Sequence, residues 1–239
     1  MTARGSTGSE APGSRPSAVP VLILGALIVV AVVLRFFRLG DWNFEGTEMF
    51  TLRDSVRPQW HNARPLGYLL NYYLVRPFRP LDELGLRLVP AIAGVLAVPA
   101  FYAVARRLVG VRPALFGALL VTLSGLQVFY SQFARYWSLV FLFCAIYPYA
   151  LYIGVRDRSG WALAVGLVTL ALAALAHPVA VVLVGGPLLW LAAVYLRPRY
   201  LRQAWTYPSF RWALAGVGVL LVLLAIRFVP LLRDWIVLH

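Results

Sequence analysis

Residues 84–105 read LGLRLVPAIAGVLAVPAFYAVA, and Arg106 and Arg107 follow directly. A helix over this apolar run reaches about 33 Å at ~1.5 Å per residue, which is enough to cross the hydrocarbon layer of a membrane. Six similar runs occur at 19–37, 113–130, 136–155, 161–176, 179–196 and 210–231. The sequence therefore predicts an all-α fold, a polytopic transmembrane helix bundle of about seven spans.

The composition supports a membrane protein. Of the 239 residues, 61% are hydrophobic, and the formal net charge is +13, whereas soluble domains have roughly 45–50% apolar residues. All basic residues are arginine, a bias typical of high-GC bacterial genomes. The arginines lie between apolar spans, where membrane topology places positive charge. We therefore expect this positive charge to interact with membrane lipids and not with nucleic acid.

Arginine distribution predicts the orientation. Residues 1–18 are rich in glycine, serine and proline and should form a disordered cytoplasmic tail, followed by a transmembrane region over 19–239. Loops 106–112, 156–160 and 197–209 hold several arginines, whereas the alternate short loops hold only Arg135. The positive-inside rule then puts the arginine-rich loops and the N-terminus in the cytoplasm, with 38–83 as the first outer loop. The expected location is the inner (plasma) membrane of a bacterium.

Residues 65–78 (PLGYLLNYYLVRPF) do not fit a simple span. They are apolar, but they are short and bracketed by arginines. We expect an interfacial or half-inserted helix on the outer face. The alternative is that they cross the membrane, which would reverse the side of every later loop.

Six of the nine acidic residues lie in the predicted outer loop. Asp54, Asp82 and Glu83 are best interpreted as solvated. The segment containing Glu45 and Glu48 begins close to the end of the first span, where a partly desolvated carboxylate can act as a base or hold a divalent cation. A merely solvated loop is the alternative.

Arginine and aromatic residues complete the candidate chemistry. Arg64 shares the predicted outer face, and arginine binds phosphate oxygens through a planar fork of donors. The segment YSQFARYW at 130–137 places Gln132, Arg135 and Tyr136 on one face if it is helical. His177 lies in a predicted outer turn. Contacts to anionic lipid headgroups and surface turns are the alternatives for these residues.

Two stretches carry a resemblance to a known family. YSQFARYWSL at 130–139 resembles the YSQEARMYSL-like motif of GT-C-type membrane glycosyltransferases, in the protein O-mannosyltransferase-like superfamily. Residues 64–108 resemble the family stretch that opens with HPPLYYLL and continues ALRLPSALFG…VPLLYLLGRRL. His177 falls where many members carry an HY or HP pair. Order and spacing match over roughly residues 35–180.

The resemblance implies a GT-C-like fold and a polyprenyl-phosphate-linked sugar as donor, used on the outer face for the cell envelope. It also implies an acidic Asp-Glu pair that activates the acceptor hydroxyl, often near a divalent cation. In one register this pair falls on Thr47-Glu48 and in another on Phe44-Glu45, so Glu48 and Glu45 are the candidate bases. The candidate substrate-binding residues are Arg64, Tyr130, Gln132, Arg135, Tyr136 and His177.

Departures from the family pattern leave alternatives open. The first acid of the pair is missing in both registers, and Phe133 replaces a glutamate of the family motif. Family members also usually carry more spans. The chain is therefore either a glycosyltransferase, acting alone or with a partner protein that supplies the missing spans, or a catalytically inactive relative that binds lipid carriers. A transporter is less favoured because most spans lack central charges.

Overall fold

A computed structural model describes residues 18–59 and 64–180, together with single positions at 206, 211, 215, 219, 222 and 226. Within that part of the chain the regular structure is helical. The helices in chain order are α1 (Val19–Phe36), α2 (Gly46–Val56), α3 (Pro65–Leu70), the π-helical turn η1 (Asn71–Val75), α4 (Glu83–Val109), α5 (Val111–Leu123), α6 (Gly125–Ser131), α7 (Trp137–Arg156) and α8 (Gly160–Ala176).

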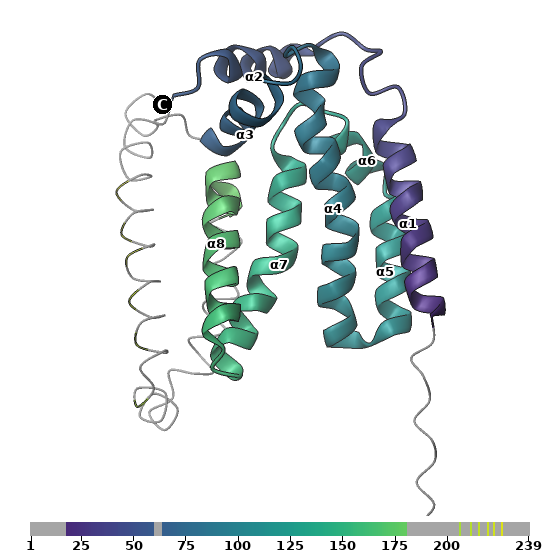
Figure 1. Ribbon diagram of the computed structural model, residues 1–239, viewed down its shortest axis with the longest axis vertical. Coiled ribbons are helices and arrows are strands. Elements are labelled where there is room, and N and C mark those ends of the chain that lie inside the picture. Colours follow the sequence, from purple (N-terminus) through teal and green to yellow (C-terminus); the bar gives the residue numbers. More distant parts are fainter. Residues whose placement is uncertain are drawn as a thin grey trace, which may run out of the picture.

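The long helices run side by side, and α2 and α3 lie across one end of this bundle (Figure 1). The α4–α5 and α7–α8 turns lie at the opposite end. α4 is central, because it packs against α1, α5 and α7. The arginine-rich turns at 106–112 and 156–160 therefore lie at the opposite end of the bundle from α2 and α3.

Helix lengths confirm a multi-pass membrane protein. Three helices, α1, α4 and α7, are long and apolar enough to cross a membrane, and the bent pair α5 and α6 makes up to four. α8 is apolar but shorter, with 17 residues. The predicted spans at 179–196 and 210–231, and the tail at 1–17, fall almost wholly outside the described residues. The count of seven spans stays a prediction.

The predicted span at 113–130 corresponds to two helices, α5 and α6, which together are long and apolar enough for one bent span. It is broken at Ser124, and α5 and α6 meet at a bend of 56°. Ser124 leaves helical geometry with ψ 115°, and its Oγ accepts a hydrogen bond from the backbone of Gln127, which starts α6. The break leaves carbonyl groups at the end of α5 without helical partners, and a buried arginine of α1 donates hydrogen bonds to them, as described below.

The segment over 65–78 forms α3 and η1, beside α2 at the end of the bundle. Pro65 stands in the first turn of α3, where its missing N–H costs nothing. The short helix continues directly into the π-helical turn, which contacts α4. The expectation that this segment is interfacial or half-inserted stays a prediction.

Candidate functional site

Glu48, in the first turn of α2, is completely buried and accepts four hydrogen bonds. Its Oε1 accepts from Arg87 Nε at 3.0 Å and from the backbone of Ala134 at 2.7 Å. Its Oε2 accepts from Arg87 Nη2 at 2.7 Å and from the backbone of Glu45 at 3.1 Å. One carboxylate thus joins the predicted outer loop, α4 and the 130–139 motif.

Arg87, in α4, extends this network. Its Nη1 donates to the carbonyl oxygens of Leu39 and Trp42, at 3.2 and 3.0 Å, and its Nη2 donates to that of Asn43 at 3.3 Å. The side chains of Arg87 and Glu48 are 3% and 0% exposed. Although burial raises the pKa of Glu48, the hydrogen bonds from Arg87 and two backbone amides outweigh it, so this pKa lies below its ordinary value.

Glu45 differs sharply from its neighbour. It is exposed and precedes α2 as the N-cap residue. It lines a hollow of about 160 Å³, the walls of which are Trp42, Asn43, Glu48, Arg87, Phe129, Gln132 and Phe133. Both candidate bases line this hollow, and Glu45 is the one whose side chain is exposed to solvent.

Tyr136 supports two arginines. The guanidinium carbons of Arg64 and Arg135 lie 5.8 and 5.6 Å from the centre of its ring. The ring itself is buried and meets Tyr68 of α3 edge to face, with centroids 5.3 Å apart. Gly67 permits this approach, because a Cβ there would lie 2.5 Å from the ring. Two half-buried cations thus share one aromatic platform.

His177 belongs to the same neighbourhood. It caps the end of α8, is buried, and stacks on Trp137 with ring centroids 4.6 Å apart. Burial, together with the positive charges of Arg64 and Arg135, lowers the pKa of His177 to about 4. The imidazole is therefore neutral at physiological pH, and its Nδ1 accepts from the backbone of Val179 at 3.1 Å.

Three of the predicted substrate-binding residues do not share one helical face as expected. α6 ends at Ser131, and residues 132–136 form bends and a turn instead of a helix. The backbone amide of Ala134 is taken by Glu48 instead of an earlier carbonyl, so a tertiary hydrogen bond replaces the helical one. The expectation of a helical face containing Gln132, Arg135 and Tyr136 is wrong for this reason.

Gln132 and Tyr130 make contacts with residues other than Arg64 and Arg135. The amide nitrogen of Gln132 donates to the carbonyl oxygens of Leu34 and Phe37, at 2.9 and 3.1 Å, and so ties the motif to the end of α1. The Tyr130 ring is tilted against Trp137 with centroids 6.0 Å apart. Tyr130 is therefore linked to His177 through the indole between them.

Sequence reasoning missed the role of Arg35, which the pattern gives only as the charged end of the first span. It is completely buried, and it donates to the carbonyl oxygens of Val121 and Thr122, at 3.1 and 3.3 Å. These carbonyls end α5, where a positive charge is favourable. Its Nε faces the tightly packed contact between Gly94 and Ser131. Arg35 thus stabilises the break that starts α6.

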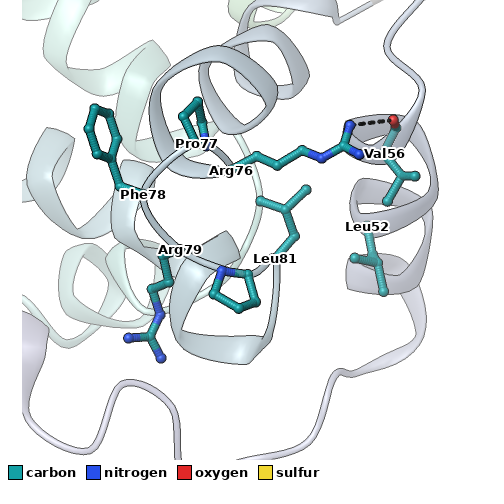
Figure 2. A pocket seen from close by; sticks show the side chains of 8 residues that line it. Leu52, Val56, Arg76, Pro77, Phe78, Arg79 and Leu81 are labelled. Atoms are coloured by element: carbon teal, nitrogen blue, oxygen red, sulfur yellow. Dashed lines mark hydrogen bonds between the residues drawn. The ribbon is translucent and has the colours of Figure 1, made fainter.

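Figure 2 shows a separate hollow of about 590 Å³ between α2 and the chain after η1. Arg76 crosses it to the carbonyl oxygen of Val56 at 3.5 Å, and Arg79 points away from Arg76 on the other side. None of the predicted site residues lines this hollow. Its arginines and the exposed Phe78 suit a lipid headgroup region better than a reaction site.

A metal site is not formed by the two glutamates. Over 18–59 and 64–180, no three histidine, cysteine, aspartate or glutamate side chains come together in the way that holds a metal ion. All four hydrogen bonds to Glu48 occupy the lone pairs that a cation would need. Glu48 therefore does not fit the divalent cation that the resemblance implies, whereas a cation at the exposed Glu45 stays a prediction.

The sequence matches the model of a known protein family. The sequence model of the family described as dolichyl-phosphate-mannose-protein mannosyltransferase matches residues 70–227, which is more than half of the 239 residues. The matched range includes α4 to α8 and the 130–139 motif, and Glu45, Glu48 and Arg64 precede it. No curated protein and no solved structure matches the chain.

Proposed function

The chain belongs to the dolichyl-phosphate-mannose-protein mannosyltransferase family, and from this membership we propose that it transfers a sugar from a polyprenyl-phosphate carrier to an acceptor hydroxyl on the outer face of the cytoplasmic membrane. The family is one of GT-C-type membrane glycosyltransferases, and its lipid-linked donor agrees with the apolar helices. The identity of the carrier, the acceptor and the membrane face are parts of the proposal.

One observation carries this proposal. The carboxylate of Glu48 binds the backbone amides of both Glu45 and Ala134, so it brings an exposed acid next to the segment that holds Arg135. An accessible carboxylate and an arginine are the two groups that displacement at a phosphate-linked sugar needs. These two segments are 86 residues apart along the chain at the Ala134 contact, so this proximity is a property of the fold.

The proposed reaction is a single displacement. The acceptor oxygen attacks the anomeric carbon while the bond from that carbon to the phosphate oxygen breaks. Glu45 takes the proton of the acceptor hydroxyl. The departing phosphate keeps the electron pair and is stabilised by Arg64 and Arg135, which lie over Tyr136. One displacement inverts the configuration of the sugar carbon.

The two acids have different proposed roles. Glu48 accepts four hydrogen bonds, and a proton could bind only after at least one of them broke. We therefore assign the base to Glu45 and give Glu48 the role of a positioning residue. The alternative that Glu48 is the base stays a prediction, and full activity in a Glu45→Gln protein that is lost on adding Glu48→Gln would favour it.

Membranes containing the full chain should consume a fluorescent or radiolabelled polyprenyl-phosphate sugar. We expect Glu45→Gln to abolish consumption and Arg135→Ala to reduce it strongly. Asp41→Asn is the matched control, because this nearby acid is exposed and its ion pair within the described part of the chain is a local one with Arg38. Full activity in the Glu45→Gln protein would refute the assigned base.

A second candidate function follows from Phe133, which stacks on Phe129 where the family motif has a glutamate. In this second function, the protein binds the lipid carrier but does not transfer the sugar. Binding of the carrier that is lost in Arg64→Ala and Arg135→Ala proteins, with no consumption in the wild type, would select this function over transfer.

A further inference from the structure

A small cavity lies beneath Tyr136, between α2, η1 and the start of α7. The space open to the centre of a water molecule is about 10 Å³, close to the smallest volume that holds one water. Its walls include Thr51, Asn71, Gly67 and Tyr136. These residues come from three parts of the chain that are far apart in sequence.

Three polar atoms at this cavity are buried without a hydrogen bond of good distance and angle to any described residue: Thr51 Oγ1, Asn71 Oδ1 and Tyr136 OH, although the Tyr136 hydroxyl lies near those of Thr51 and Tyr68. Thr51, Asn71 and Tyr136 are 2%, 3% and 2% exposed, so bulk water cannot reach them. A buried polar group without a partner costs roughly 1–3 kcal/mol. Three such groups around one cavity are therefore best explained by a shared ligand.

The pattern of donors and acceptors identifies that ligand. The amide nitrogen of Asn71 donates to Ser55 Oγ at 3.1 Å, which leaves Oδ1 as an acceptor. Thr51 and Tyr136 each carry a hydroxyl that can donate. A water molecule accepts from both hydroxyls and donates to Oδ1. A metal cation is disfavoured, because Arg135 lines the cavity and no carboxylate does.

We propose that this cavity binds one ordered water molecule, which joins α2, η1 and Tyr136 into a single hydrogen-bonded unit. The π-helical turn begins at Asn71, and such turns are frequent at functional sites. The water fixes the phenol of Tyr136, and the ring of Tyr136 lies under Arg64 and Arg135. Its relevance to phosphate binding rests on the proposed function, whereas the water site itself does not.

The test is a structure of the full chain in a lipid nanodisc, from a map that shows other ordered water. We expect a density peak within hydrogen-bonding distance of the three oxygen atoms, about 2.7–3.2 Å. We expect the peak to disappear in the Thr51→Val protein, which keeps the side-chain shape. Thr169→Val is the matched control, because that hydroxyl donates within α8 and lies outside the cavity walls.

A wild-type map with no peak at this position would overturn the proposal. A peak that persists in the Thr51→Val/Tyr136→Phe double variant would overturn it as well. A second measurement covers variants that fold poorly. Thr51→Val and Tyr136→Phe should lower the melting temperature less together than the sum of their separate effects, because either change already breaks the bridge. Additive effects would contradict the water bridge, and no result here depends on glycosyl transfer.

Discussion

Replacement of Arg87 by methionine tests whether the Glu48–Arg87 pair holds the predicted outer loop to the bundle. The variant leaves the Glu48 carboxylate buried with only two backbone donors, from Glu45 and Ala134. Removal of one partner of a buried ion pair costs about 3–5 kcal/mol. We therefore expect the ratio of folded to unfolded protein to fall at least about a hundredfold.

The control is Arg79→Met, which removes the same kind of side chain from an exposed pair. The Arg79 and Asp82 side chains are 40% and 41% exposed, against 3% and 0% for the buried pair. Exposed pairs contribute about 0–1 kcal/mol. The free energy of unfolding can be measured for both proteins in mixed micelles with increasing sodium dodecyl sulfate, followed by tryptophan fluorescence.

The pH dependence of stability gives a second test of the same prediction. The pKa of Glu48 lies below its ordinary value of 4.5, so the ion pair stabilises the fold above that pH and is lost as the pH falls through the lower, folded-state pKa. The stability difference between wild type and Arg87→Met should shrink in acid. A loss no larger than that of the Arg79→Met control at neutral pH would refute the reasoning.

Three further changes have defined outcomes. Gly94→Ala places a Cβ 2.0 Å from Ser131 Oγ and should cost roughly 1–3 kcal/mol in the same unfolding assay, whereas Gly25→Ala meets nothing within 4 Å and should be nearly neutral. The folded-state pKa of His177 is about 4, below its ordinary value of 6.5. Because the unfolded chain takes up this proton more readily, the free energy of unfolding should fall as the pH falls from 6.5 to about 4. The His177→Gln protein should show a smaller fall than wild type over that pH range. Arg35→Met should destabilise the protein and Arg35→Lys should restore part of the loss, because lysine keeps the charge at the end of α5 but not the fork that spans two carbonyls; equal losses in both variants would contradict that role.

The sequence was sufficient to locate the long helices, because the length of an apolar run is set by the membrane. α4 begins at Glu83 and α7 begins at Trp137, each within one residue of the predicted span. The break at Ser124 was not predicted, because the composition stays apolar across it. What stabilises the break is Arg35, which is 86 residues away at its Val121 contact.

The candidate site was predicted only as a set of residue types. Glu45, Glu48, Arg64 and Arg135 were named from charge, spacing and resemblance, but their different roles depend on burial. Glu48 pairs with Arg87 at a separation of 39 residues, and no local period reveals such a contact. Tyr136 was expected to bind substrate, which stays a prediction, and the structure adds that its buried ring lies against Arg64 and Arg135.

The start of α2 offers a candidate to replace the first acid of the family pair, which this sequence lacks. If Glu48 corresponds to the second acid of the family pair, the first position is Thr47, the exposed hydroxyl of which is not a base at neutral pH. Glu48 cannot easily replace it, because its four hydrogen bonds are what hold the loop. Glu45 lies three residues earlier, and its backbone amide is bound by Glu48 itself. The buried acid therefore positions the exposed one, and loss of Glu48 should displace the proposed base, Glu45, as well as weaken the fold.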